Sequence, residues 1–314
     1  MFEGGYHNEI ASVGKTVTKL ISIDSLFRAD YSTSQSNDFI WKMNSTESNV
    51  QSLRLVSFEL PVMWYDVSDK NGTNTFTMTI EGDTVTSNNK EQLIKIESGI
   101  YTAKQMSTIL NNIISNKFDK RVNFSISDIT GKSSFRFNSI EGVPLPDEIS
   151  YSLDFNNYKS PGQDSLGIFL GFTDNKYVVM GNESTASVTD YTGVSIIEYY
   201  GVLESSKSYM TGVFKYIYLS VDDFVKNHTV TSVTASNGNI YLGDNILGRI
   251  PVKGDAHSII VSSEASSGDI FKKRDYTGPV NLNNLRIRLL DKFGRPLDIN
   301  NNDFSLALEI TSSY

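Results

Sequence analysis

The chain has 314 residues, a length that allows one large domain or two of ordinary size. Serine, asparagine and threonine make up more than a quarter of it, which favours strands and turns over a helical bundle. The net charge of −8 argues against wrapping duplex nucleic acid, and the lack of cysteine excludes disulfides and favours a reducing compartment. With no basic segment before an apolar run and no apolar stretch near the roughly 18 residues of a membrane helix, we expect neither a signal peptide nor a transmembrane segment.

Apolar and polar residues alternate through much of the chain, a period of two that predicts β-strands. The clearest alternating runs lie at 76–80, 122–126, 135–137, 214–221 and 304–310. Turn-forming residues at 128–132 join the second and third runs as a hairpin. Both faces of the fourth run are apolar, which predicts a central strand. Short strands separated by Asn, Gly and Ser turns indicate an all-β protein, an antiparallel sandwich or barrel.

One helix interrupts this pattern near 102–117. Thr102 and Gln105 have the spacing of a capping box, and Tyr101 can pack onto Met106 as a hydrophobic staple. The apolar stripe behind the cap consists of Met106, Ile109, Leu110, Ile113 and Ile114. We expect this helix to cover one face of a sheet or to close one end of a barrel, and a partner-binding groove is the alternative.

Prolines and glycines at 141–165 interrupt the strand pattern and place a domain boundary there. We therefore expect an N-terminal docking arm at 1–15, a β-rich domain at 16–158 that contains the helix, and a β-sandwich domain at 159–314. The arm is unpatterned and contains glycine, as is typical of a segment that orders on contact or of a frayed terminus. Pairing between the two terminal strands of the chain would invalidate this division.

Motifs that would indicate catalysis or metal binding are weak. Residues 14–16 match the end of a phosphate-binding loop, but the glycine required five residues earlier is Glu9, and the three histidines are isolated. Asp222 and Asp223 are adjacent on a strand and would point to opposite faces, which disfavours a hydrolytic carboxylate pair. The asparagine-rich segment 298–303 predicts a tight hairpin rather than a calcium loop. We expect no enzymatic activity, no cofactor and no metal.

Three well-separated segments share their residues with a known family. They are 22–28 with 31–34 and 38–39, then 50–55 running into 58–61, and finally 289–295 with 298–301 and 303–306. In these segments the chain resembles the minor capsid proteins of nucleocytoplasmic large DNA viruses, the giant viruses. The helix and the segment 97–102 lie between the second and third motifs, as in the family. Asn302 and Pro296 depart from the pattern, because a methionine and an aliphatic residue are more frequent at these two positions.

The resemblance implies sandwiches of jelly-roll type, two of them in tandem if the domain boundary holds, incorporated into an icosahedral capsid. It implies a structural protein of the virion, assembled in the host-cell cytoplasm, that stabilises the shell through the major capsid protein and other minor capsid proteins. Direct binding of nucleic acid is not expected. A position near an internal viral membrane is compatible with the resemblance. The alternative function is a carbohydrate- or receptor-binding sandwich on the virion surface.

Aromatic and arginine residues are the expected interface anchors, because these residue types dominate binding energy at protein interfaces. The candidates are Trp41, Trp64, Tyr65, Tyr199, Tyr200, Arg286 and Arg288. For each aromatic residue, packing in the core is the competing interpretation. The two arginines share one strand face and can either form cross-strand ion pairs or contact a neighbouring subunit.

The motif residues also predict local geometry. Residues 293–296 should form a turn, with 285–289 and 304–308 as the two arms of a hairpin-like unit. Arg28 and Arg54 are candidates to pair with Asp24 and Glu59, respectively. Such surface pairs stabilise a protein by only about 0–1 kcal/mol, so their value would lie in fixing geometry.

Overall fold

The computed structural model describes residues 15–82, 91–118, 121–137, 149–155, 165–180, 186–189, 195–210, 215–228, 245–253, 257–263, 270–271 and 273–314. For 186–189, 195–200 and 270–271 it describes the backbone alone. Apart from Lys15, the docking arm expected at 1–15 lies outside the described residues.

The chain divides into two compact units. Unit 1 combines the described residues of Met1–Met63 with those of Phe214–Tyr314, and unit 2 consists of Trp64–Val213. Unit 2 is therefore inserted into unit 1. This division differs from the domains expected at 16–158 and 159–314, because the two ends of the chain pair with each other: β1 (Thr16–Asp24) lies antiparallel to β16 (Ser305–Ser313).

Unit 1 is built from strands, with one short 3-10 helix, η1 (Ser25–Phe27), among its described residues. Besides β1 and β16, the strands are β2 (Asp38–Pro61), β11 (Tyr216–Asp222), β12 (Ile246–Pro251), β13 (Ile259–Ser263), β14 (Ile270–Phe271) and β15 (Lys273–Leu290). The predicted runs at 214–221 and 304–310 correspond to β11 and β16.

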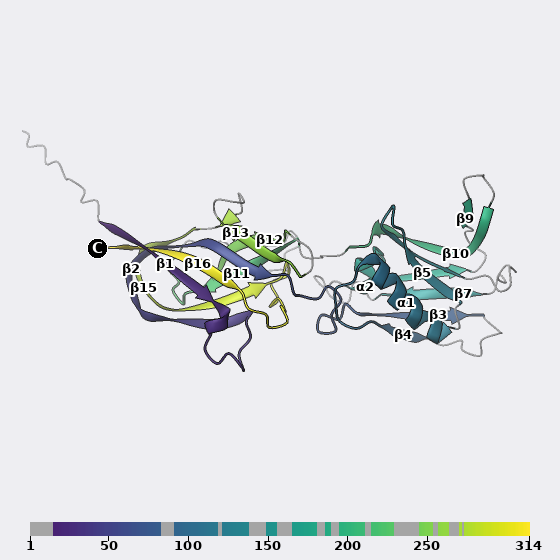
Figure 1. The fold of residues 1–314 in the computed structure, drawn as a ribbon, viewed down its shortest axis with the longest axis horizontal. Helices are drawn as coiled ribbons and strands as arrows, with labels where there is room; N and C mark the ends of the chain where they lie inside the picture. The colour runs from purple at the N-terminus through teal and green to yellow at the C-terminus, as the bar shows by residue number, and fades with distance from the viewer. Residues whose placement is uncertain are drawn as a thin grey trace, which may run out of the picture. The chain divides into compact units, whose positions relative to one another are not determined.

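The long strands β2 and β15 curve around one end of unit 1 (Figure 1), and β2 takes part in two layers. Its second half lies between β16 and β13, which gives the order β1-β16-β2-β13. Its first half pairs with the end of β15, which gives the order β2-β15-β11-β12-β14. Two antiparallel layers with this connectivity form a jelly roll. The all-β, jelly-roll sandwich expected from the sequence is thus confirmed in unit 1.

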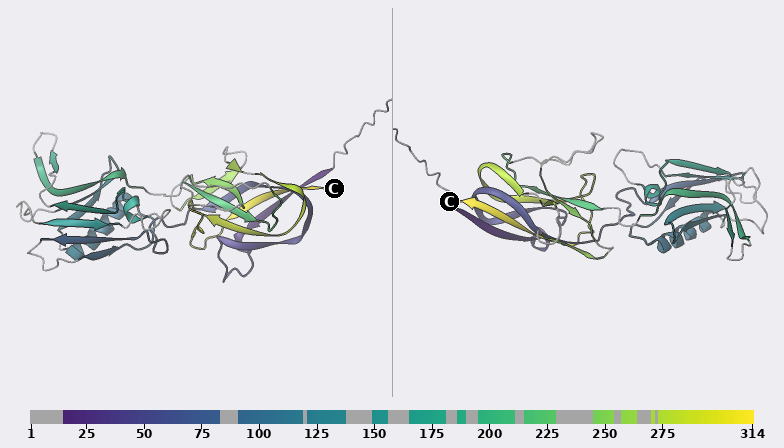
Figure 2. Two further views of the ribbon diagram at one scale, coloured as in Figure 1. Left: turned by 180° about the vertical axis from the view of Figure 1, so that it is seen from behind. Right: turned by 90° about the horizontal axis from the view of Figure 1, so that it is seen from above.

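Apolar side chains fill the space between the two layers of unit 1. The ring of Phe304 lies 6.1 Å from that of Phe39, on the first half of β2, and 5.7 Å from that of Phe58, on its second half. A Cβ at Gly248 of β12 would lie 3.3 Å from a methyl group of Leu55, which shows how closely the layers approach. Figure 2 shows the curvature of the long strands from two further sides.

The segments 285–289 and 304–308 do not form the hairpin expected from the sequence. They lie in β15 and in the start of β16, and both strands pair with β2. The reason is that the connection 291–304 crosses from one layer to the other. The turn itself is confirmed: Asp291 accepts the backbone N–H groups of Phe293 and Arg295 at 2.8 and 2.9 Å, and Gly294 has a φ of +81°.

Unit 2 contains two four-stranded antiparallel sheets and two helices among its described residues. One sheet has the order β5 (Val122–Ile126), β6 (Lys132–Phe137), β10 (Ser195–Ser208) and β9 (Ala186–Thr189). The other has the order β4 (Gln92–Lys95), β3 (Thr75–Glu81), β7 (Ser150–Asp154) and β8 (Lys176–Met180). The helices are α1 (Ala103–Phe118) and α2 (Leu166–Phe169). The strands predicted at 76–80, 122–126 and 135–137 correspond to β3, β5 and β6.

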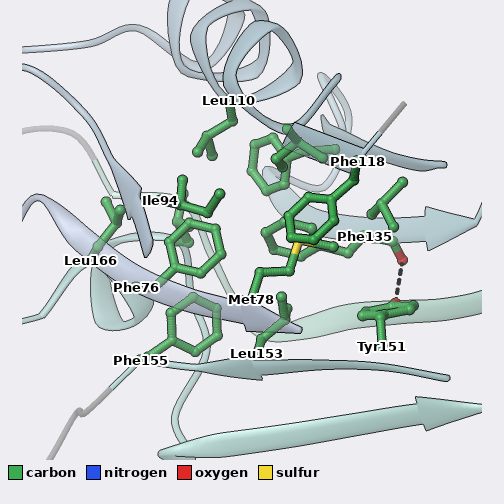
Figure 3. Close-up of a cluster of buried hydrophobic side chains, with 14 of the residues drawn as sticks. Phe76, Met78, Ile94, Leu110, Phe118, Phe135, Tyr151, Leu153, Phe155 and Leu166 are labelled. Carbon is green, nitrogen blue, oxygen red and sulfur yellow. Dashed lines mark hydrogen bonds between the residues drawn. The ribbon is translucent and has the colours of Figure 1, made fainter. Parts of the chain in front are cut away.

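An aromatic core joins the two sheets of unit 2 (Figure 3). The ring of Phe76 on β3 lies 6.0 Å from that of Phe135 on β6, and Phe135 lies 4.7 Å from Phe124 on β5. Tyr151 on β7 is buried, and its hydroxyl donates to the carbonyls of Phe135 and Gly201 at 3.1 and 2.9 Å. The alternating phenylalanines that predict these strands therefore face one shared interior.

Helix α1 packs against β4 and β5, which are edge strands of the two different sheets. The capping box is confirmed: Gln105 N–H donates to Thr102 Oγ1 at 3.3 Å, and Thr102 N–H donates to Gln105 Oε1 at 3.0 Å. The buried stripe is Met106, Leu110, Ile114 and Phe118. The helix therefore closes the side of the sandwich between these two edge strands. This position differs from both expected ones, over one face of a sheet or at one end of a barrel.

Candidate interface surfaces

The opening and closing motifs meet in unit 1 at Arg28, whose side chain is fully buried. Its guanidinium donates to Asp303 Oδ1 at 2.6 Å and to the carbonyl of Ser25 at 2.8 Å. It also donates to Asn301 Oδ1 at 3.2 Å and lies 4.1 Å from the centre of the Tyr31 ring. A buried arginine is costly unless its charge and its N–H groups are satisfied. These contacts satisfy it, and we call the set the arginine lock.

Further hydrogen bonds tie the same two segments together, although they lie 278 positions apart in the sequence. Ser25 N–H donates to the carbonyl of Phe304, and Phe304 N–H donates to Ser25 Oγ, both at 2.9 Å. Tyr31 donates its hydroxyl to Asp303 Oδ2 at 2.9 Å, and this bond raises the pKa of the Tyr31 phenol. The residues of the opening and closing motifs thus fix the geometry of one end of the jelly roll.

The ion pair expected between Arg28 and Asp24 is not formed. Arg28 pairs with Asp303 instead of Asp24, since the lock brings a distant carboxylate within contact distance. Asp24 has another role, because its carboxylate accepts Leu26 N–H at 2.8 Å and caps η1.

Cross-strand neighbours also surround Arg54 and Glu59 on β2. Arg54 pairs with Glu309 of β16 at 3.0 Å, and Glu59 accepts the hydroxyl of Ser305 at 2.7 Å. Residues on adjacent strands approach each other closely when they are in register or diagonal to it. Both contacts connect the second motif to the closing motif.

The arginine lock supports an exposed apolar turn, formed by Leu26 and Phe27 of η1, which we call the apolar tip. Leu26 is 49% exposed and Phe27 is 71% exposed, whereas Ser25 and Arg28 on either side are buried. A rigid aromatic group loses little conformational entropy when it binds a partner. The two residues of the tip are not among the interface anchors expected from the sequence. Their signal there is an apolar pair that follows the helix-capping Asp24 in the opening motif.

The aromatic candidates lie in different environments. Trp41 on β2 is half-buried, Trp64 is 3% exposed, and Tyr65 is 38% exposed. The position of Trp64 favours the core-packing interpretation, while Trp41 and Tyr65 are accessible to a partner. Tyr199 and Tyr200 lie in β10, but their side chains are outside the described residues.

The two arginines of β15 have different partners. Arg286 forms a two-pronged pair with Asp38 of β2, with both N–O distances at 2.8 Å, and this hydrogen bonding raises the pKa of Arg286. Arg288 donates to Ser220 Oγ of β11 at 3.3 Å. Its Nε is buried and has no hydrogen-bond partner among the described residues. For Arg286, the cross-strand ion pair is the alternative that the structure shows.

Asp222 and Asp223 diverge, as their adjacent positions predict. Asp223 is buried and binds Arg274 at 2.6 Å, and it also accepts the hydroxyl of Tyr276 at 2.6 Å. Asp222 instead accepts the backbone N–H of Phe224 at 2.9 Å. The pair therefore stabilises the end of β11 and does not form two facing carboxylates.

The described part of the chain contains no group of three or more His, Asp or Glu side chains arranged to hold a metal ion. Within the same residues, no helix has the length and apolar character needed to cross a membrane.

Comparison with known proteins gives weak structural similarities. No protein-family model matches the chain, and no curated protein matches its sequence. The penton protein of mavirus is similar over 96% of this chain and 100% of its own, with 11% identity and a TM-score of 0.47. A chain of the Sputnik virophage is similar over 95% of this chain and 98% of its own, with 14% identity and a TM-score of 0.44.

Proposed function

We propose that this chain is a structural minor capsid protein of a large icosahedral DNA virus. In this role it stabilises the shell through contacts with the major capsid protein and other minor capsid proteins, and it resides in the virion after assembly in the host-cell cytoplasm. The single observation that carries the proposal is the arginine lock. It joins the opening and closing segments that resemble the minor capsid family at one end of a jelly roll.

The motif residues have structural roles. Arg28 and Asp303 fix one end of the sandwich, Arg54 and Glu59 connect β2 to β16, and Asp291 closes the turn after β15. A shell subunit needs such rigidity, because each copy must present the same surfaces to its neighbours. A fold alone does not define a function, so the proposal rests on the motifs together with their placement.

The contact surfaces in this proposal combine accessible aromatic groups with the apolar tip. Trp41, Tyr65 and Phe27 are exposed or half-exposed, and interface energy concentrates on such residues. Stable protein interfaces bury about 1,200–2,000 Å² in total. The proposed contributors also include Tyr199, Tyr200, Arg286 and Arg288. The ion pair with Asp38 already occupies part of the Arg286 guanidinium.

Quantitative mass spectrometry on purified, salt-washed virions tests this function. We expect a fixed ratio to the major capsid protein that survives washing and removal of the internal membrane. Abundance in infected cells with absence from the particle would reject the capsid role. Glycan arrays and receptor screens would then test the alternative of a binding sandwich.

A further inference from the structure

We propose that copies of this chain associate head to tail in unit 1, with the apolar tip of one copy against β13 of the next. This inference rests on the proposed function and names one of the contacts that the shell role requires. The receiving surface is formed by Ile259 and Val261, which are 65% and 68% exposed. They are two residues apart on β13 and so share one face of the strand.

The tip and the receiving surface lie at opposite edges of the same layer. Among the described residues, β1 ends the strand order on one side, and β13 pairs with β2 on the other. Figure 1 shows the end of β1 and the β13 arrow on opposite sides of unit 1. A single copy therefore presents both halves of one contact near two separate edges of the layer, and Ile259 and Val261 lie on its solvent face because Ile260 between them is buried.

The two surfaces also lie at the same level along the strands. One row of paired residues crosses the layer from Asp24 through Ser305 and Glu59 to Val261. Because β1 and β13 run in opposite directions, Leu26 beyond Asp24 and Ile259 beyond Val261 lie on the same side of this row. The tip of one copy can therefore meet the receiving surface of the next without a shift along the strand direction.

This level match determines what kind of assembly the contact favours. A contact between two different surfaces of identical subunits is heterologous, and it gives a closed ring when successive copies do not rise along the axis and the rotation between them closes. Two surfaces at one level satisfy the first of these conditions for an axis parallel to the strands. The occupant we assign to the receiving surface is thus a second copy of this chain.

The apolar tip has the properties of an anchor for such a contact. Phe27 is the large exposed group, and the arginine lock holds its turn through buried Arg28 before any partner arrives. The opposite surface offers two β-branched side chains on a strand already paired with β2. Aromatic residues are enriched at the centres of protein interfaces, where burial of apolar surface stabilises the contact.

The test uses the full-length chain and three single variants, followed by sedimentation velocity over a concentration series. Phe27→Asp alters the tip, Val261→Asp alters the receiving surface, and Val178→Asp is the matched control. Val178 is also an exposed valine, at 60%, and it lies on β8 at an edge of a sheet in unit 2. Thermal unfolding of each variant confirms that the fold is retained.

We expect the unaltered chain and the Val178→Asp control to associate equally, while each of the other two variants weakens association by at least about tenfold. An equimolar mixture of Phe27→Asp and Val261→Asp should form a one-to-one dimer and nothing larger, because only one intact tip can meet one intact receiving surface. A monomeric unaltered chain, equal loss in the control, or no dimer in the mixture would each overturn the inference. Stable incorporation into virions by a chain that fails these assays would reject only the self-contact, whereas association without incorporation would reject the capsid role.

Discussion

The arginine lock shows how a few residues determine the geometry of one end of the jelly roll. Arg28 is fully buried, and its only acidic partner among the described contacts is Asp303, which is 24% exposed in its side chain. The same carboxylate accepts hydrogen bonds from Ser25 and Tyr31. Removing one partner of a buried ion pair destabilises the fold far more than replacing both partners with apolar residues, because the remaining charge stays buried without a partner.

Replacing Asp303 with alanine should therefore lower the free energy of unfolding by about 3 kcal/mol. The matched comparison is Glu309→Ala, which removes the half-exposed pair with Arg54 and should cost about 0–1 kcal/mol. Urea denaturation of both variants measures the difference. Equal losses would show that the lock does not behave as a buried pair.

Tyr151 gives a prediction for alkaline pH. Burial raises the pKa of its phenol above the ordinary value near 10, so the folded state keeps the hydroxyl neutral where the unfolded state ionises. The contribution of Tyr151 to stability is therefore complete below about pH 10 and is lost as the pH rises further. Tyr151→Phe should cost about 1 kcal/mol at neutral pH. It should also make the alkaline loss less steep, which urea unfolding across the pH series detects; an unchanged slope would contradict this.

At the scale of elements, helix α1 protects an exposed sheet edge. Asn111 donates to the carbonyl of Phe124 at 2.7 Å and accepts Phe124 N–H at 2.8 Å. The side-chain amide thus replaces the strand that would otherwise pair with β5 at this point. Edges of this kind promote unwanted strand pairing when they are left open.

Asn111→Ala should lower the free energy of unfolding by about 1–3 kcal/mol, because it leaves two partly buried backbone groups without a partner. It should also accelerate hydrogen exchange at the Phe124 amide. The neighbouring Asn112 is exposed, so Asn112→Ala provides a control with the same chemical change. Similar exchange rates in both variants would argue against edge protection by Asn111.

At the scale of the whole molecule, the insertion of one unit into the other determines which pieces can fold. The core of unit 2 draws its buried residues from Val67 to Val179, and unit 1 requires both ends of the chain. A cut between residues 158 and 159 would separate β7 from its partner β8. Such a cut leaves neither fragment with a complete set of strands.

Residues 64–213 expressed alone should therefore fold cooperatively, with a single unfolding transition in circular dichroism. The fragments 16–158 and 159–314 should each lack such a transition. Folding of these two fragments, together with failure of 64–213, would show that the division into units is wrong.

Local sequence patterns were sufficient to predict several strands, the helix and some of their details. The alternation of Phe76, Met78 and Ile80 predicts β3, and Thr102 with Gln105 predicts the start of α1, because both signals act between neighbouring residues. The divergence of Asp222 and Asp223 follows from strand geometry in the same way. The ion pair of Arg28 does not follow from local patterns, since 275 positions separate Arg28 from Asp303.

The amino-acid sequence by itself determined the all-β character, the capping of the helix and the position of the turn at 293–296. Only the tertiary structure decided that the chain ends pair, that unit 2 is inserted, and that Leu26 and Phe27 form an exposed tip on a buried lock. The physical reason is one of distance along the chain. Periodicity and capping depend on residues a few positions apart, whereas strand pairing and buried ion pairs join residues that only the complete fold brings together.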